Sequence, residues 1–154
     1  MLSNQYTITE IQQILNAGGA IVKDHSVNTL LTDSRRISNP AGALFFALSG
    51  RRNGHEFIAS AYAAGVRNFV VRQGSEIKAP EANFLMVDDV LAALQTLAAY
   101  HRSRFNLEVI GITGSNGKTI VKEWLYQLLA SDKNIVRNPK SYNSQIGVPL
   151  SVWQ

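Results

Sequence analysis

The chain alternates short apolar runs with amphipathic segments, and this alternation limits its fold more than any other feature of the 154 residues. Apolar runs of about four to eight residues predict buried strands, whereas apolar side chains that recur every three or four residues predict helices. Strands are predicted at residues 28–32, 43–48, 68–72 and 84–87. Because strands that alternate with helices build parallel sheets covered by helices, we expect an α/β protein.

Three helices are predicted around these strands, at 8–17, within HEFIASAYAAG and at 88–104. In the first, Thr7 and Glu10 have the spacing of a capping box, and Gly18 is the expected stop. The second lies between two strands and forms a β-α-β unit with them. The third has Asp88 as its expected N-cap.

A second domain is predicted after the segment SRFN at 103–106. There LEVIGI is predicted to be a buried strand, IVKEWLYQLLA a helix with Trp124 in its apolar core face, and NIVR another strand. The predicted domains are therefore 1–106 and 107–154. Because one β-α-β piece cannot cover its own sheet, we expect the chain to be the front part of a longer protein.

Composition and charge exclude several classes of function. The 15 basic and 11 acidic residues give a net charge of +4, which suits an anionic small molecule and does not require nucleic acid. The absence of cysteine excludes disulfides, thiolate zinc sites and cysteine nucleophiles. His25 and His101 have no partner at metal-ligand spacing. No leader or membrane-spanning run is recognisable, so we expect a cytoplasmic protein.

The strongest chemical signal is the glycine loop GITGSNGKT between a predicted strand and a predicted helix. Such glycines let backbone N–H groups converge on phosphate oxygens at the start of a helix. The predicted ATP-binding residues are Gly114, Ser115, Asn116, Gly117, Lys118 and Thr119. Lys118 would reach the β- and γ-phosphates as the catalytic cation, and the Thr119 hydroxyl would bind the Mg²⁺ that accompanies ATP.

The spacing of this loop departs from the common phosphate-loop pattern. That pattern has glycine where this chain has Ile112, and the glycines here are Gly111, Gly114 and Gly117. The alternative is a glycine-rich turn with an incidental lysine. The GKT sequence and its position between a strand and a helix favour nucleotide binding.

Two loops in the first domain are further candidate sites. Asp33, Ser34 and Arg35 follow a strand, where open α/β sheets present ligand-binding loops, and Arg35 could pair with a diphosphate. A turn with solvated arginines is an equally good explanation of these residues. Gly54 and His55 lie directly before a helix, where a phosphate or a uracil group would fit, although this segment could also be a structural cap.

Several segments together resemble the Mur ligases of bacterial cell-wall synthesis, whose ATP loop is similar to GxxGxNGKT. The segments are LTDSRRI at 31–37, LFFALSGRRNGHEFI at 44–58, AGVRNFVV at 64–71 and SYNSQIGVP at 141–149. The resemblance covers nearly the whole chain. It implies a small three-layer α/β N-terminal domain that binds the UDP substrate, followed by the first β-α-β piece of a P-loop ATPase domain.

Within the family, the sequence most resembles the ligases that join D-alanyl-D-alanine to UDP-N-acetylmuramoyl-tripeptide, especially those fused to an alanine racemase. The sibling ligase that adds the third amino acid shares several segments. The resemblance implies UDP contacts for Asp33, Ser34, Arg35, Gly54 and His55, and a peptide-substrate loop at Ser141 and Asn143. The implied cofactors are ATP and Mg²⁺, with no nucleic acid or membrane partner.

The implied reaction transfers the γ-phosphoryl group of ATP to the peptide carboxylate, and an amine then attacks the acyl phosphate to form an amide. Family members also use downstream metal ligands, a modified lysine and a further domain, which lie outside these 154 residues. We therefore expect this chain alone to be inactive as a ligase. The alternatives are a non-catalytic uridine-nucleotide-binding module and an unrelated kinase or ATPase with the same loop.

Overall fold

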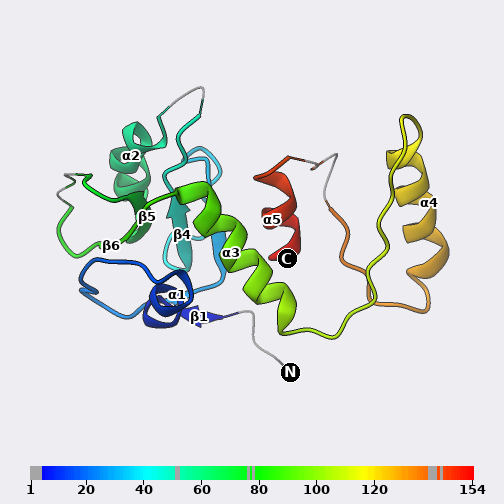
Figure 1. Ribbon diagram of the computed structural model, residues 1–154, viewed down its shortest axis with the longest axis horizontal. Coiled ribbons are helices and arrows are strands. Elements are labelled where there is room, and N and C mark those ends of the chain that lie inside the picture. Colours follow the sequence, from blue (N-terminus) through cyan, green and yellow to red (C-terminus); the bar gives the residue numbers. More distant parts are fainter. Residues whose placement is uncertain (1–4, 51–52, 76, 78, 139–141, 143) are drawn as a thin grey trace. The chain divides into compact units, whose positions relative to one another are not determined.

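The computed structural model describes residues 5–50, 53–75, 77, 79–138, 142 and 144–154, and the chain forms two compact units (Figure 1). The first unit is Met1–Leu97 and the second is Ala98–Gln154. The division falls inside helix α3 (Val90–Ser103), slightly before the boundary that the sequence predicts at 103–106.

The first unit is built on a parallel sheet of four strands in the order β3-β4-β5-β6. Its strands are β3 (Thr29–Leu31), β4 (Ala43–Phe46), β5 (Asn68–Arg72) and β6 (Asn83–Val87). All four predicted strands are thus confirmed, as is the α/β class. A two-stranded antiparallel ribbon of β1 (Tyr6–Thr7) and β2 (Ser26–Val27), which the sequence did not predict, lies beside it.

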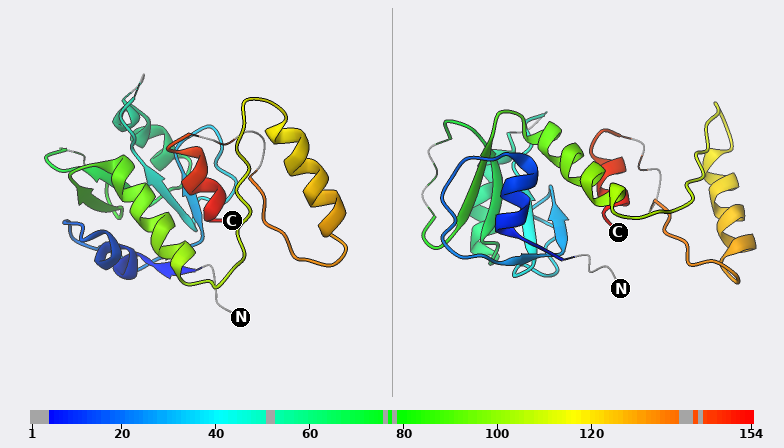
Figure 2. Two further views of the ribbon diagram at one scale, coloured as in Figure 1. Left: turned by 45° about the vertical axis from the view of Figure 1, so that its right-hand side comes forward. Right: turned by 60° about the horizontal axis from the view of Figure 1, so that its bottom comes forward.

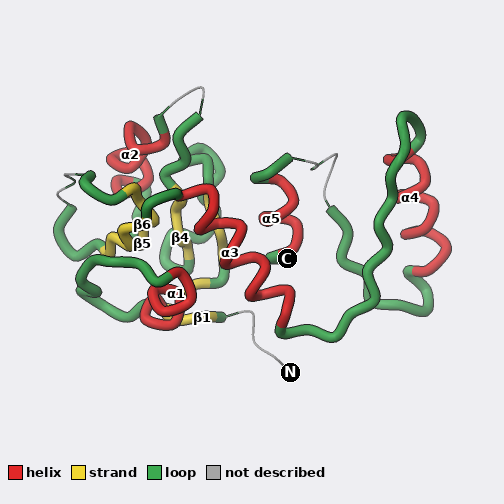
Figure 3. The backbone as a smooth tube through the Cα atoms, viewed as in Figure 1, coloured by secondary structure: helices red, strands yellow, loops and turns green. Residues whose placement is uncertain are grey.

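Helices cover both faces of this sheet. The 3-10 helix η1 (Gly54–Phe57) and α2 (Ile58–Ala63) connect β4 to β5 and confirm the predicted β-α-β unit (Figures 2 and 3). On that face Phe45 packs edge-on against Phe69 with ring centroids 6.1 Å apart. Helix α1 (Ile8–Leu15) and the start of α3 lie on the opposite face. Since alternate strand residues face opposite sides, both faces of the sheet are buried.

The predicted helix starts and stops are partly confirmed. The capping box is present, because Thr7 Oγ1 accepts from the Glu10 N–H at 3.2 Å and the Glu10 carboxylate accepts from the Thr7 N–H at 2.7 Å. The expected stop at Gly18 is wrong, because Asn16 already takes a left-handed conformation (φ 47°) that ends the helix. The expected cap at Asp88 is also wrong, because Asp89 accepts from the first backbone N–H groups of α3.

Two fully buried asparagines tie the segment before β2 to the sheet. Asn68 and Asn83 are neighbours across β5 and β6, and Asn83 Nδ2 donates to Asn68 Oδ1 at 2.7 Å. Asn83 also accepts from the Val22 N–H at 2.7 Å and donates to the Lys23 carbonyl at 2.8 Å. His25 Nδ1 lies 3.1 Å from Asn68 Oδ1. These bonds satisfy amides that would otherwise be costly to bury.

Replacing Asn83 with alanine should destabilise the chain by about 2 kcal/mol or more, because the partners of its amide lose their hydrogen bonds inside the protein. Chemical denaturation measures this change. The control is the exposed Asn39→Ala, which should shift the free energy of unfolding by less than about 0.5 kcal/mol. Equal stability of the two variants would contradict a structural role for the buried pair.

The second unit contains the rest of α3, α4 (Lys118–Leu129) and α5 (Gly147–Val152), the last of which the sequence did not predict. The predicted helix of the glycine loop is confirmed. The strands predicted at 107–112 and 134–137 are wrong, because neither segment is a strand and Val109 is 70% exposed. A strand needs a hydrogen-bonded neighbour, and the described part of this unit contains none.

The apolar face of α4 is exposed. Trp124 was expected in a core but is 63% exposed, and Ile120 and Leu128 are exposed as well. On a different face of α4, Lys122 Nζ donates to the Asn138 carbonyl oxygen at 2.9 Å. The sequence thus encodes the amphipathic helix, but no described residue buries its apolar face.

Candidate binding pocket and phosphate loop

Both candidate loops of the first unit lie at the carboxyl edge of the parallel sheet. The register pairs Leu31 of β3 with Phe45 of β4, and Phe46 of β4 with Val70 of β5. The segments that follow these strands therefore leave the sheet at the same edge, where open α/β sheets bind their ligands. This places the 33–35 loop and the loop of Gly54 and His55 on one side of the unit.

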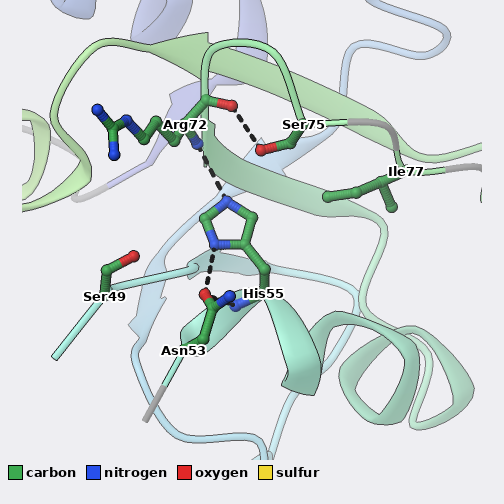
Figure 4. A pocket seen from close by; sticks show the side chains of 6 residues that line it. All are labelled: Ser49, Asn53, His55, Arg72, Ser75 and Ile77. Carbon is green, nitrogen blue, oxygen red and sulfur yellow. Dashed lines mark hydrogen bonds between the residues drawn. The ribbon is translucent and has the colours of Figure 1, made fainter. Parts of the chain in front are cut away.

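A pocket of about 390 Å³ lies at this edge, between the loop after β4 and the turn after β5 (Figure 4). Its lining residues are Ser49, Asn53, His55, Arg72, Ser75 and Ile77. His55 was predicted from the sequence as a site residue, whereas Arg72, Ser75 and Ser49 were not. Arg72 could have been found, because it is the last residue of a predicted strand and so lies at the ligand-binding edge.

His55 joins the two sides of the pocket. Its Nε2 accepts a hydrogen bond from the backbone N–H of Arg72 at 3.2 Å, and its Nδ1 lies 3.0 Å from Asn53 Oδ1 (Figure 4). Because Nε2 accepts, the neutral ring carries its proton on Nδ1 and donates it to the Asn53 carbonyl oxygen. Burial, and then the positive charge of Arg72, lower the pKa of His55.

Gly54 is required by close contact rather than by backbone conformation. A Cβ at this position would lie 2.4 Å from the Leu48 carbonyl oxygen and 2.5 Å from the Leu48 nitrogen. The Gly54 N–H also donates to that carbonyl oxygen at 2.8 Å. Gly50 in the same loop has nothing within 4 Å of its Cβ position. Gly54 therefore shapes the loop that carries His55.

Gly54→Ala should destabilise the chain by about 1–3 kcal/mol, because the added methyl group would displace backbone rather than a flexible side chain. The matched control is Gly50→Ala, which should be tolerated because the space beside it is open. Denaturation midpoints of the two variants make the comparison. Similar losses in both would show that close packing at Gly54 is unimportant.

The free energy of unfolding should decrease as the pH is lowered below about 6.5, the ordinary pKa of histidine. The pKa of His55 is lowered mainly by burial, as is that of His101, so the unfolded chain binds more protons in this range and stability rises with pH. In His55→Gln one titrating group is removed while a side-chain oxygen remains to accept from Arg72. Urea midpoints between about pH 5 and about pH 8 should change less in the variant than in the wild type. If the urea midpoint of the variant changes with pH as steeply as that of the wild type, His55 does not contribute to the pH dependence.

The Asp33 and Arg35 side chains bind each other. Arg35 Nε and Nη2 donate to Asp33 Oδ1 and Oδ2 at 2.9 and 2.7 Å. Hydrogen bonds from the Arg35 side chain, and then from its backbone N–H, hold the pKa of the Asp33 carboxyl well below its usual range. The pair is largely exposed on the arginine side. Asp33 therefore orients the guanidinium of Arg35, which still has N–H groups available to donate. Ser34, which lies between them in the sequence, is half-buried.

The glycine loop of the second unit has two residues in a backbone conformation that favours glycine. Gly114 and Gly117 have positive φ angles of 142° and 76°, which side-chain-bearing residues rarely adopt. Gly117 is the N-cap of α4 and provides no side-chain cap. Ser115 and Asn116, between these glycines, are exposed. The loop thus presents backbone N–H groups at the positive end of a twelve-residue helix.

Lys118 lies over this loop rather than in the protein interior. Its Nζ donates to the Gly114 carbonyl oxygen, and the Ser115 carbonyl oxygen lies 3.4 Å away. Its ammonium group therefore lies against the backbone of the loop. Thr119 follows as the second residue of α4 and is exposed.

Other predicted features lie outside these two sites. Ser141 and Asn143, the predicted peptide-substrate loop, lie outside the described residues. Among the residues that are described, no group of three or more His, Asp or Glu side chains is arranged to hold a metal ion. No helix in the same part of the chain is long and apolar enough to cross a membrane.

Comparison with known proteins decides the family. A family model described as "Mur ligase family, catalytic domain" matches residues 26–102, which is 77 of the 154 residues. The chain belongs to the Mur ligase family. The sequence resemblance is thereby confirmed. The match includes the 33–35 loop, Gly54, His55 and the rest of the pocket at the sheet edge.

Relatives of this Mur ligase chain carry a more specific name. It is 38% identical over 133 residues to the UDP-N-acetylmuramoyl-tripeptide--D-alanyl-D-alanine ligase of Synechocystis sp., covering 86% of this chain and 29% of that protein. It is 33% identical over 147 residues to the Escherichia coli ligase of the same name, covering 95% of this chain and 31% of that protein.

Solved structures agree with these relatives. The UDP-N-acetylmuramoylalanyl-D-glutamyl-2,6-diaminopimelate--D-alanyl-D-alanyl ligase of Acinetobacter baumannii matches 97% of this chain and 33% of its own, with a TM-score of 0.84 and 31% identity. MurF ligase of Thermotoga maritima in complex with ADP matches 82% of this chain and 29% of its own, with a TM-score of 0.70 and 28% identity. The chain therefore spans about a third of the length of its relatives.

Proposed function

We propose that this chain provides the substrate-binding part, and the beginning of the ATP-binding part, of a ligase that joins D-alanyl-D-alanine to UDP-N-acetylmuramoyl-tripeptide. The observation that carries the proposal is the likeness to the Acinetobacter baumannii ligase, which extends over 97% of the chain. Such a ligase acts in peptidoglycan synthesis and so in cell-wall biogenesis, cell shape and cell division. We propose a cytoplasmic location for this enzyme.

The first unit is proposed to bind the UDP part of the substrate. Asp33, Ser34 and Arg35 form one side of the binding surface, and the loop of Gly54 and His55 forms the other. Arg35 suits a diphosphate because only its Nε and Nη2 donate to Asp33. The other N–H groups of the guanidinium can donate to phosphate oxygens. We propose that residues 1–106, which include the first unit and the rest of α3, form the UDP-binding domain.

Residues 107–154 are proposed to begin the ATP-binding domain. The backbone at Gly114 and Gly117, the uncapped start of α4 and the ammonium of Lys118 together fit a phosphate group. Ser115 and Asn116 supply further backbone donors. The complex of the Thermotoga maritima ligase with ADP supports an adenine nucleotide as a ligand. When ATP binds, the Lys118 ammonium would donate to phosphate oxygens in place of the Gly114 and Ser115 carbonyl oxygens.

The chemistry proposed for the whole enzyme is acyl phosphate formation followed by amide formation. Lys118 would neutralise charge on the phosphates during transfer. The Thr119 hydroxyl is the group of this chain that would hold Mg²⁺ beside ATP. Ser141 and Asn143 are proposed to lie near the peptide end of the substrate.

A second candidate function is a uridine-nucleotide-binding module without catalysis. It is favoured by the complete sheet and pocket of the first unit and by the exposed apolar face of α4 in the second. The sibling ligase that adds the third amino acid remains an alternative for the substrate. The names of the relatives favour D-alanyl-D-alanine.

Titration calorimetry with UDP and with ATP tests the proposal on the 154-residue chain. UDP should bind, because the first unit contains the parallel sheet, the 33–35 loop and the pocket at the carboxyl edge. With ATP and all substrates present the chain should release no ADP above background, because it spans about a third of the length of the ligases it resembles. Failure to bind UDP would contradict the proposed substrate site, and turnover at about 1 per second or faster would contradict the inactivity of this chain.

A further inference from the structure

Two residues that line the pocket at the carboxyl edge of β5 have different roles. His55 reaches across it, and Arg72 supplies its charge. We propose that His55 is a positioning residue that holds the loop after β4 against the end of β5, and that the Arg72 guanidinium is the group that meets a phosphate-bearing ligand. The inference rests on the proposed uridine-nucleotide site and reassigns the role of His55 within it.

The ring of His55 has no nitrogen left for a ligand. Nε2 accepts from the Arg72 N–H, and Nδ1 donates to Asn53 Oδ1. Asn53 Oδ1 also accepts from the His55 backbone N–H at 3.2 Å, so Asn53 and His55 form one locked unit. A ligand could hydrogen-bond to the ring only by displacing one of these partners. The contacts therefore favour a structural link over direct recognition.

The link joins two segments that are each fixed independently. On one side, Gly54 is pressed against Leu48, and Ser49 pairs with Asn53 in an isolated bridge. On the other side, Ser75 Oγ donates to the Arg72 carbonyl at 2.7 Å and closes the turn after β5. The bond from the Arg72 N–H to His55 connects these two segments across the pocket. It therefore holds one wall of the pocket against the other.

Arg72 is the charged group of the lining. Its side chain is exposed, and its guanidinium makes no hydrogen bond or ion pair with another described residue. The described lining contains no carboxylate, while Ser49, Asn53 and Ser75 add polar groups. In Figure 4 the guanidinium extends away from the ring of His55 while the backbone N–H points toward it. An unpaired arginine among neutral polar groups favours an anion, and phosphate is the anion of a nucleotide.

The volume of the pocket agrees with this ligand class. Small-molecule sites commonly enclose about 300–1,000 Å³, and this pocket of about 390 Å³ is at the lower end of that range. Burial, and then the charge of Arg72, lower the pKa of His55 and so favour its neutral imidazole. A neutral ring leaves Nε2 free to accept from the Arg72 N–H, which a protonated ring could not do.

The first test is the tautomer of His55 in the ligand-free chain, read from the ¹⁵N shifts of its ring by NMR. The chain has three histidines, and the signals that disappear in His55→Gln identify this one. The proposal expects a protonated Nδ1 and an unprotonated Nε2, and it expects this state to persist when UDP is added. A ring protonated on Nε2, or one that changes tautomer on UDP binding, would overturn the positioning role.

The second test compares the affinities of variants for UDP and for uridine. Arg72→Gln should weaken UDP binding about tenfold or more and leave uridine binding within about twofold, as expected for a lost charge-assisted hydrogen bond. The matched control is Arg104→Gln, an exposed arginine of the second unit, which should leave UDP binding unchanged. Equal losses for UDP and uridine in Arg72→Gln would overturn the phosphate contact.

The third test separates positioning from contact at His55 itself. His55→Gln keeps a side-chain acceptor for the Arg72 N–H and should retain UDP affinity within about threefold, whereas His55→Leu should lose about tenfold or more. Equal loss in both variants, with both folded by circular dichroism, would overturn the proposal. If the wild-type chain binds no UDP, the proposed function fails, while the tautomer of the free chain still decides the role of His55.

Discussion

The parallel register of β3 to β6 is the constraint on which the first unit depends. Because neighbouring strands run the same way, their carboxyl ends meet at one edge, and loops from distant parts of the sequence come together there. The same arrangement buries both faces of the sheet, which explains why β4 is apolar at all four positions. The core and the pocket are thus consequences of one pairing pattern.

The two candidate sites use glycine for different physical reasons. Gly54 lies so close to Leu48 that any side chain would collide with backbone. Gly114 and Gly117 have positive φ angles, and a Cβ there would meet nothing closer than the Asn116 carbonyl oxygen, 3.7 Å from the Gly114 position. The first requirement is tertiary, since the backbone that crowds Gly54 belongs to the chain leaving β4. The second is local, since it arises from the turn that leads into α4. Only the second can be recognised from the spacing of glycines alone.

The second unit shows how far local pattern can predict structure. The helix after the glycine loop forms as expected, because its hydrogen bonds lie within the segment. The apolar runs at 107–112 and 134–137 do not form strands, because a strand takes its hydrogen bonds from another segment. The exposed Trp124 has the same explanation, since an amphipathic face is buried only when another element covers it.

The sequence by itself determined the α/β pattern, the four strands of the sheet, the capping box of α1 and the glycine loop, as well as the family. Each of these is encoded in residue types at short spacing. Only the tertiary structure decided that His55 bonds to the backbone of Arg72 and that Arg35 pairs with Asp33. It also decided that Arg72 lines the pocket. The reason is that side-chain partners depend on strand register and loop geometry, which a linear pattern does not specify.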